Sequence, residues 1–517
     1  MMDKTLLAID NGTQSIRALL FSLEGELLAK SKVDIEAYYS DQPGWAEQDP
    51  DYFWNKLCAA CQGLWSNNNV DRAAIASIAL TTQRSTVVNL DRQGKPLRPA
   101  MVWLDQRHLE QVPKLKGPWR YLIKAAGGED ILNYYRSQAE RNWIAHHQPD
   151  IWQATDKFLL LSGYLNHKLC GRYADSTASQ VGYLPFDFKQ HRWCSSFDWR
   201  WQALTVKPRQ LPSLHLPGSV IGRISKAASD ATGLPCGLPL VAAGSDKACE
   251  VIGSGALSPA IGHISYGTTA TFNTTSPRYF ETTPMLPPYP AAIPRHYSTE
   301  VIVHRGYWMV NWFKREFARE EISQAAELGV AVETLFEPLL ASVPAGSMGL
   351  TLQPYWSPGL RIPGPEAKGA IIGFGDVHTR AHLYRAIVEG IAYALREGKE
   401  RVEKQSRKNI HTLMVSGGGS QSDGVMQITA DIFGMEATRP HTYETSGLGA
   451  AINGAIGAGL FDDHRHAIEA MTHRGRAFTP QPQNQKLYDQ LFKEVYTPLY
   501  ERLKPLYQSI RRIVGYP

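Results

Sequence analysis

The sequence of 517 residues lacks a long hydrophobic run. Its longest small and apolar stretch, Gly447 to Phe461, is rich in glycine, contains Asn453 and is too short to cross a bilayer. A first apolar strand is expected within a few residues of the amino terminus, which leaves no room for a signal peptide. We therefore expect a soluble, cytoplasmic protein without a membrane partner.

Cysteine is scarce and is not spaced for a metal site or a disulfide framework. No second Cys or His pair accompanies Cys58 and Cys61, the only two that stand close together. Both fall in an amphipathic helix expected over residues 52–65. The pattern predicts reduced, buried thiols at the six positions Cys58, Cys61, Cys170, Cys194, Cys236 and Cys249.

An excess of one charge sign is also missing. Lys and Arg number 54 against 49 Asp and Glu, and no basic run concentrates the formal charge of +5. Nucleic acid and anionic membranes are therefore not indicated as partners. A hydrophobic content of 43% with 20% charged residues is typical of globular proteins. The chain is too long for one ordinary core, so we expect two large domains.

The most informative stretch that is present is a polar turn between two apolar strands near the amino terminus. The turn is Asn11-Gly12-Thr13-Gln14-Ser15. Its hydroxyls and amide N–H groups suit a phosphate, and Gly12 permits tight backbone curvature. Arg17 adds a cation, and Asp10 adds a carboxylate suited to Mg²⁺, directly or through water. The alternative is an ordinary hairpin with a polar turn.

A second Gly-Thr turn stands in the other half of the chain. Gly267-Thr268-Thr269 also lies between two strand-like runs, 262–265 and 269–274. This similarity indicates a domain-scale duplication with one phosphate hairpin in each domain; chance similarity of two turns is the alternative. We place the first domain at residues 1–252 and the second at 253–517.

The rest of the chain alternates strand-like and helical segments. A helical and loop region reaches to about residue 200, and a loop rich in proline and aromatic residues follows at 277–294. Gly417-Gly418-Gly419 stands between a strand and a helix, as in nucleotide-binding turns, but it is neither GxGxxG nor a Walker A loop. Strands are expected at 6–9, 16–23, 27–35, 74–81, 86–90, 100–103, 240–243 and 412–415, and further helices at 381–403, 425–433 and 485–514.

In this order the segments resemble the FGGY family of carbohydrate kinases, over nearly the whole chain. The resemblance implies an α/β fold of two actin-like, ribonuclease-H-like domains that flank a catalytic cleft. It also implies transfer of the γ-phosphoryl group of ATP, with Mg²⁺, to a hydroxyl of a ketose or related carbohydrate; a homodimer stays open. The matching segments are Asp10–Arg17, Pro43–Pro50, Thr82–Arg84, Val102–Arg107, Gly244–Ala248, Ser265–Thr269, Gly369–Gly390 and Gly417–Gly419.

The resemblance also assigns the nucleotide-binding residues. Asp10 and Asp246 would hold Mg²⁺ through water. Asn311 would help to line the adenosine pocket, although a helix-surface amide before Trp312 is the alternative. The full ATP set is Gly12, Thr13, Gln14, Ser15, Arg17, Gly267 and Thr268 at the phosphates, and Asn311, Gly418, Gly419 and Ser422 at the adenosine.

Asp246 is the predicted general base. It follows a buried strand and a Gly-Ser turn, a place from which a carboxylate can reach into a cleft. Phosphoryl transfer to an alcohol needs a group that accepts the hydroxyl proton. The alternative from the residues alone is that Asp246 caps the following helix, and the resemblance favours catalysis.

The acceptor is less determined than the donor. Where glycerol kinases have Glu and Gln, this chain has Ser85 and Lys247, and xylulokinases have Met-His where it has Gln83-Arg84. A glycerol-type polyol kinase therefore stays as an alternative to a ketose kinase. Lys247 would suit an acidic or phosphorylated sugar, or would simply point outward. The candidate sugar residues are Gln83, Arg84, Trp103, Asp105, Tyr135, Asp246 and Lys247.

Two further alternatives stay open. The aromatic segment from Tyr279 to Trp312 would cover the sugar, build a subunit contact or pack in the core. A function of another class is an actin-like ATP switch without sugar kinase activity. Asp246 and the hydroxyl-binding hairpin argue against the switch.

Overall fold

The computed structural model describes residues 4–112, 115, 117–204, 206–357, 359 and 363–515. Within these ranges, no helix has the length and apolar character needed to cross a membrane. The chain folds into two compact units. Unit 1 contains Met1–Leu257, Ser276–Ser298 and Glu444–His473, and unit 2 contains Ser258–Thr275, Thr299–Tyr443 and Arg474–Pro517.

Unit 1 is built on a six-stranded sheet with the order β13-β14-β5-β1-β2-β3. β1 pairs antiparallel with β2, whereas β1 and β14 both run parallel to β5. Because successive side chains of a strand point to opposite faces of the sheet, the side chains of these strands belong to two different cores. The strands are β1 Thr5–Asn11, β2 Ser15–Phe21, β3 Leu27–Asp34, β5 Ile75–Thr82, β13 Val220–Arg223 and β14 Pro239–Ser245.

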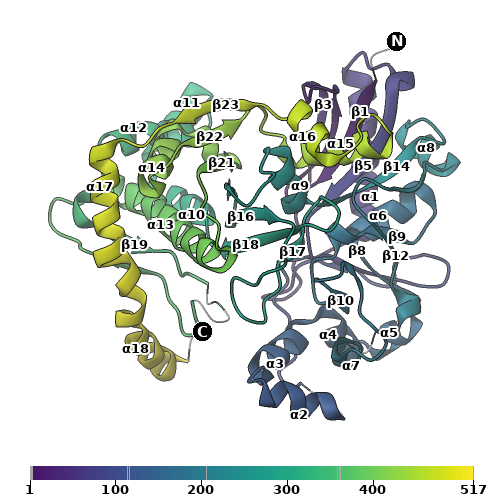
Figure 1. The fold of residues 1–517 in the computed structure, drawn as a ribbon, viewed down its shortest axis with the longest axis horizontal. Coiled ribbons are helices and arrows are strands. Elements are labelled where there is room, and N and C mark those ends of the chain that lie inside the picture. Colours follow the sequence, from purple (N-terminus) through teal and green to yellow (C-terminus); the bar gives the residue numbers. More distant parts are fainter. Residues whose placement is uncertain are drawn as a thin grey trace. The chain divides into compact units, whose positions relative to one another are not determined.

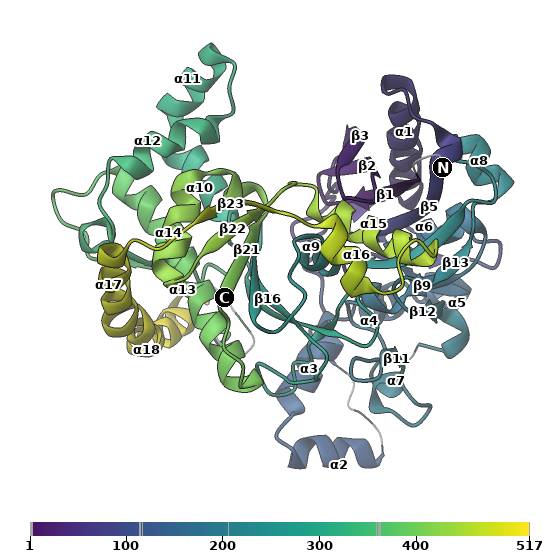
Figure 2. The same ribbon diagram turned by 45° about the horizontal axis from the view of Figure 1, so that its top comes forward.

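Helices cover both faces of this sheet. Leu7 and Ile9 pack in a core with α1 Pro50–Asn67, α6 Leu161–Cys170 and α8 Lys226–Thr232. The opposite face, which includes Leu6 and Ala8, packs in a core with α9 Asp246–Gly253, α15 Thr445–Gly457 and α16 His464–Met471. α15 lies beside β1 and β5 although it is far from them in sequence (Figures 1 and 2).

A second, four-stranded sheet of unit 1 has the order β4-β7-β6-β8 and packs against an aromatic core with α3 and α4. The remaining elements of the unit are β4 Glu47–Gln48, β6 Val87–Leu90, β7 Ala100–Met101, α2 Pro118–Ala125, α3 Glu129–Gln138, α4 Glu140–His147, α5 Pro149–Ala154, β8 Lys157–Leu160, β9 Ala174–Ser176, β10 Phe186–Asp187, β11 Arg192–Trp193, α7 Trp199–Leu204, β12 Ser213–His215 and β17 Tyr289–Pro290.

Unit 2 has its own sheet, in which β18-β16-β15-β21-β22-β23 are neighbours in this order. β15 pairs antiparallel with β16 and parallel with β21, as β1 pairs with β2 and β5 in unit 1. The elements are β15 Ile261–Tyr266, β16 Ala270–Ser276, β18 Tyr297–Val303, α10 Trp308–Phe317, α11 Arg319–Leu328, α12 Phe336–Ala341, β19 Thr351–Gln353, β20 Ala370–Ile372, α13 Arg380–Ser406, β21 Thr412–Ser416, α14 Asp423–Phe433, β22 Ala437–Pro440, β23 Arg474–Phe478, α17 Pro482–Gln490 and α18 Thr497–Val514.

The predicted strands and helices agree with the structure to within a few residues, with two exceptions. The region before residue 200 also contains β8 to β11, which have two to four residues each and are too short to show a period. The predicted surface helix 485–514 is two helices joined by the π-helical turn Leu491–Tyr496. Its inner face is buried, because Phe492 and Tyr496 stack near Tyr393 of α13.

Two segments of the predicted second domain, Ser276–Ser298 and Glu444–His473, belong to unit 1, so the chain does not divide at residue 252 alone. Small residues let α15 approach α9 closely. A Cβ on Gly449 would lie 2.0 Å from the carbonyl oxygen of Cys249, and one on Gly253 would lie 2.0 Å from that of Thr445. The small and apolar run that is too short for a membrane is therefore a helix packed directly on another helix.

Candidate active site

Three parallel strands of unit 1 end at one edge of the sheet. Asn11 and Ser245 are both register partners of Thr82, so the ends of β1, β5 and β14 are level. The Gly12 turn, Gln83-Arg84 and Asp246 follow these ends directly. The carboxyl edge of parallel strands is where α/β proteins bind ligands.

Asp10 and Arg17 are cross-strand neighbours on β1 and β2. The Arg17 Nη2 lies 2.7 Å from Asp10 Oδ2, and Oδ1 has no hydrogen-bond partner in the described part of the chain. Burial raises the pKa of Asp10 to about 6; Arg17 opposes this, and Asp246, Glu444 and Glu250 add to it. The local field at Asp10 therefore favours a cation.

The predicted phosphate turn is tight. The Gly12 N–H donates to the Ser15 carbonyl at 3.1 Å, and a Cβ on Gly12 would lie 3.7 Å from Arg17 Nη2. Gln14 is exposed, whereas Ser15 is buried at the start of β2. The Trp103 indole N–H donates to Thr13 Oγ1 at 3.1 Å. Trp103, predicted for the sugar, and Thr13, predicted for the phosphates, thus lie together.

Asp246 opens α9 without capping it. Ser245 is the N-cap, and its hydroxyl accepts from the Ala248 N–H. Asp246 Oδ1 accepts from the Lys247 N–H at 2.7 Å. Burial raises the pKa of Asp246, while Arg84 and Lys247 oppose the increase. Ser245 therefore performs the helix capping that was the alternative role for Asp246.

Lys247 does not point outward. Its ammonium is 2.7 Å from Glu250 Oε2, one helical turn further along, and its side chain is only 19% exposed. Glu250 was not predicted from the sequence, although its i, i+3 spacing from Lys247 in a helix indicates such a pair. Because Glu250 pairs with Lys247, the positive charge next to Asp246 is largely neutralised.

Asn11 and Gln83 are buried amides at the same edge. Their backbones are joined by a 2.8 Å hydrogen bond, and the side-chain oxygen and nitrogen of each lack a hydrogen-bond partner among the described residues. A buried amide without a hydrogen-bond partner costs free energy, so these two side chains are suited to bind a polar ligand. Arg84 lies over the ring of Tyr289, 5.3 Å from its centroid.

Two predicted sugar residues are held by other parts of unit 1. Asp105 binds the Arg107 guanidinium and accepts from the Ala46 N–H at 2.8 Å. The Tyr135 hydroxyl donates to the Leu184 carbonyl at 2.7 Å. Both polar groups are therefore engaged in the structure as it stands, and their contact with sugar stays a prediction.

The predicted adenosine and second phosphate residues form a separate group in unit 2. Ser265 and Ser416 are register partners, so the Gly267 turn and the glycine run lie at adjacent ends of β15 and β21. Gly417 has φ +82°, and a Cβ there would lie 2.8 Å from the Tyr266 backbone. Only glycine fits this approach.

Tyr307 joins these two turns and was not predicted as a site residue. Its N–H donates to the Gly267 carbonyl at 3.0 Å, and a Cβ on Gly419 would lie 2.2 Å from its ring. Its buried hydroxyl has no hydrogen-bond partner within the described ranges. The sequence signal was its place in the aromatic segment.

The other predicted residues of unit 2 are Thr268, Asn311 and Ser422. Thr268 and Asn311 are exposed, and Asn311 lies on α10. Ser422 is the N-cap of α14, where its hydroxyl accepts from the Val425 N–H at 3.1 Å. Its hydroxyl is therefore already used by the helix.

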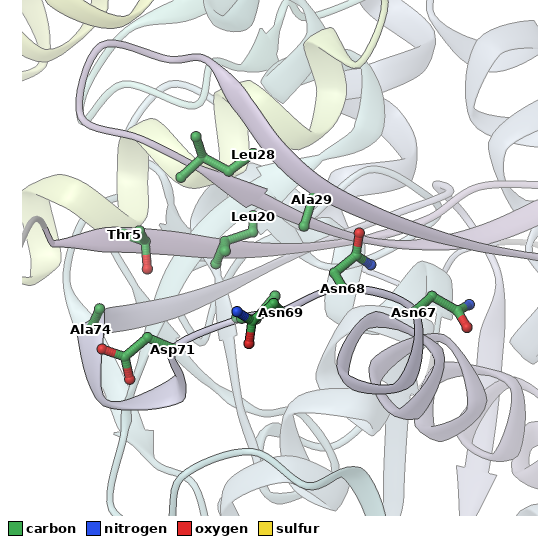
Figure 3. A pocket seen from close by; sticks show the side chains of 10 residues that line it. Thr5, Leu20, Leu28, Ala29, Asn67, Asn68, Asn69, Asp71 and Ala74 are labelled. Atoms are coloured by element: carbon green, nitrogen blue, oxygen red, sulfur yellow. The ribbon is translucent and has the colours of Figure 1, made fainter.

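A hollow of about 620 Å³ lies elsewhere in unit 1 (Figure 3). Thr5, at the amino end of β1, lines it, whereas the predicted site residues follow the carboxyl ends of the strands. Leu28 and the run Asn67–Asn69 also face it. None of the predicted catalytic or binding residues lines this hollow.

The fold defines a class of protein, the two-domain α/β proteins with actin-like domains. A solved xylulose kinase from Rhodospirillum rubrum matches with a TM-score of 0.82 and 24% identity, over 98% of this chain and 100% of that one. A gluconate kinase from Lactobacillus acidophilus matches with a TM-score of 0.79 and 21% identity, over 98% of each chain.

The family follows from sequence. The FGGY family of carbohydrate kinases matches with its N-terminal domain at residues 5–253 and with its C-terminal domain at 262–458. The chain belongs to this family.

Curated relatives agree. A sugar kinase of Escherichia coli, described as uncharacterised, is 28% identical over 100% of this chain and 98% of its own length. A xylulose kinase of Lactococcus lactis is 28% identical over 95% and 96%, and a glycerol kinase of Dechloromonas aromatica 28% over 92% and 93%. The protein is thus a carbohydrate kinase that transfers phosphate from ATP to an alcohol group.

Proposed function

We propose that this kinase phosphorylates a hydroxyl of a ketose or related neutral carbohydrate, with Asp246 as the general base. The observation that carries the proposal is the place of Asp246. It is a half-buried carboxylate beyond the end of β14, level with the Gly12 turn, and Ser245 performs the capping of α9. The named xylulose kinases among the relatives support a ketose acceptor.

In this mechanism the acceptor hydroxyl loses its proton to an Asp246 carboxylate oxygen as its own oxygen bonds to the γ-phosphorus. The bond from that phosphorus to the bridging oxygen of ADP breaks in the same step, so ADP leaves with the electron pair. Asn11 and Gln83 would donate to and accept from the sugar hydroxyls. Arg17 and the Gly12 turn would hold the phosphates of ATP.

The residues at Asp10 fit a magnesium ion held mainly through water. Among the described residues there is no group of three His, Cys, Asp or Glu side chains suited to a metal, and Mg²⁺ often takes one or two carboxylates, water and phosphate oxygens. Asp10 Oδ1 has no hydrogen-bond partner there, and Asp246 is near enough to raise the pKa of Asp10. Bound Mg²⁺ would neutralise phosphate charge.

The charges favour a neutral acceptor over an acidic sugar. Lys247 is paired with Glu250 at 2.7 Å, so it adds little net positive charge for a carboxylate or phosphate on the sugar. The two unmet amides, by contrast, match hydroxyl groups, which both donate and accept. A glycerol-type polyol is the alternative acceptor, since a glycerol kinase is also among the relatives.

Release of ADP, measured against a panel of ketoses, polyols and sugar acids, tests the proposal. We expect turnover with a ketose well above the sugar-free background. A preference for glycerol would support the polyol alternative, and one for a sugar acid would contradict the charge argument. Turnover no faster than background with every compound would contradict the proposed class of acceptor.

Asp10 provides a test with opposite effects on stability and activity. Because its pKa is raised from 3.8 to about 6, the folded state binds more protons than the unfolded state between these values. Stability is therefore lost as pH rises through this window, by about 3 kcal/mol at pH 7. We expect Asp10→Asn, without nucleotide or Mg²⁺, to raise Tm at pH 7 and to have little effect near pH 4. Turnover should fall sharply; a lower Tm at pH 7 would contradict the charge argument.

A further inference from the structure

Glu444 binds two cations of the hairpin that carries the predicted phosphate turn. Its Oε2 lies 2.6 Å from Arg17 Nη1 on β2, and its Oε1 binds Lys30 on β3. The Glu444 side chain is only 8% exposed. Its carboxylate therefore lies buried between a guanidinium and an ammonium, where charge-assisted hydrogen bonds are strong.

The helix does not explain a glutamate at this position. Glu444 is the N-cap of α15, yet its side chain makes no capping hydrogen bond. Ser, Thr, Asp and Asn are the residues preferred at an N-cap. The carboxylate instead extends to the hairpin, so its contacts with Arg17 and Lys30 account for the residue type.

The guanidinium of Arg17 is held from two sides. Nη2 binds Asp10 at 2.7 Å and Nη1 binds Glu444 at 2.6 Å, which orients the plane of the group. Arg17 lies over the turn, because a Cβ on Gly12 would be 3.7 Å from Nη2. A guanidinium has five N–H donors, and Nε of Arg17 is buried without a hydrogen-bond partner in the described structure.

The charges of the group are balanced. Arg17 and Lys30 supply two positive charges, and Asp10 and Glu444 supply two negative ones. Because Lys30 binds the second oxygen of Glu444, the carboxylate can hold Arg17 while its own charge is compensated. The remaining N–H donors of Arg17 can then meet a phosphate without a neighbouring uncompensated anion.

We propose that Glu444 is a positioning residue for the phosphates of ATP. It holds the guanidinium of Arg17 over the Gly12 turn, with Lys30 compensating its charge. This inference rests on the proposed contact between Arg17 and the phosphates. Glu444 acts through Arg17 and touches neither nucleotide nor sugar itself.

The test compares the binding of ADP and of adenosine to the full chain by calorimetry, with Mg²⁺ present for ADP. Adenosine is the control ligand, because it has no phosphate. We expect Glu444→Gln to weaken ADP binding about tenfold and to leave adenosine binding unchanged. Arg17→Leu should weaken ADP binding at least as much, and the double variant should be no weaker than Arg17→Leu alone.

Glu321→Gln is the matched control variant. Glu321 is equally buried, at 8% exposure, and pairs with Arg380 at 2.9 Å in unit 2. The ADP affinity of this variant should equal that of the wild type, even where Tm falls.

Three results would overturn the inference. Wild-type ADP affinity in Glu444→Gln, with weak binding in Arg17→Leu, would refute Glu444 alone. Wild-type affinity in both variants would refute the proposed contact of Arg17 and the inference with it. Additive losses in the double variant, or equal loss of ADP and adenosine binding, would show that Glu444 does not act through Arg17.

Discussion

Asp246→Asn is expected to reduce sugar-dependent turnover by about 100- to 10,000-fold, the usual contribution of a general base. The amide has nearly the same shape as the carboxylate but cannot accept the hydroxyl proton. Its oxygen can still accept from the Lys247 N–H, as Oδ1 does at 2.7 Å, so α9 should keep its start. Because Ser245 is the N-cap, the helix loses no capping interaction.

Binding measurements separate this loss from misfolding. Affinity for ADP should remain within a few fold of wild type, since none of the other predicted nucleotide residues changes. Asp431→Asn is the control, because Asp431 is a buried carboxylate that accepts hydrogen bonds from Gln427 and the Gln481 N–H in unit 2. It should lower Tm without a selective loss of turnover. Near-normal turnover in Asp246→Asn would refute the general base.

The pH dependence of turnover gives a second readout for Asp246. Burial raises the pKa of this carboxyl above 3.8, although Arg84 and Lys247 oppose the shift. Since only the ionised carboxylate accepts a proton, kcat should reach its maximum above the raised pKa and fall as pH decreases through it. Lys247→Met removes a cation that lowers the pKa of Asp246 and that also compensates Glu250, which raises this pKa. The limb should therefore move to higher pH, as measured by kcat against pH.

Gly449→Val is expected to destabilise unit 1 strongly. A Cβ at Gly449 would lie 2.0 Å from the carbonyl oxygen of Cys249 and 2.6 Å from its carbonyl carbon. These are backbone atoms of α9, so they cannot move aside as a side chain would. Packing an oversized side chain costs about 1–3 kcal/mol or more, so Tm should fall by a few degrees.

The same change should also reduce turnover of the folded protein. α9 begins at Asp246, so a shift of this helix away from α15 displaces the proposed base. A displacement of about 1 Å can cost 100-fold in rate. Gly375→Ala is the control, since the nearest atom to a Cβ there is 3.7 Å away. An unchanged Tm and kcat in Gly449→Val would contradict the close packing of the two helices.

Strands, turns and their polar residues could be predicted where residues close together in the sequence determine them. The hairpin from Asp10 to Arg17 joins two almost fully buried apolar strands through a glycine turn, so its strands could be predicted within a residue or two. The same holds for the β15 and β16 hairpin around Gly267. Family membership follows from the order of such segments along the chain.

The partners of these segments could not be predicted in the same way. Glu444 lies 427 residues from Arg17 in sequence, and no periodicity links the two positions. Tyr307 was visible only as one aromatic residue among many, whereas in the fold its N–H binds the Gly267 carbonyl at 3.0 Å. Asp105 has a motif-like position, but its carboxylate binds Arg107.

The sequence by itself determined the family, the two Gly-Thr turns and the aspartate that follows β14, because strands, turns and their polar residues are local patterns. Only the tertiary structure decided which charges meet. It placed Glu444 against Arg17 and Lys30, paired Lys247 with Glu250, and left capping of α9 to Ser245. The physical reason is that side-chain direction and long-range packing select these partners.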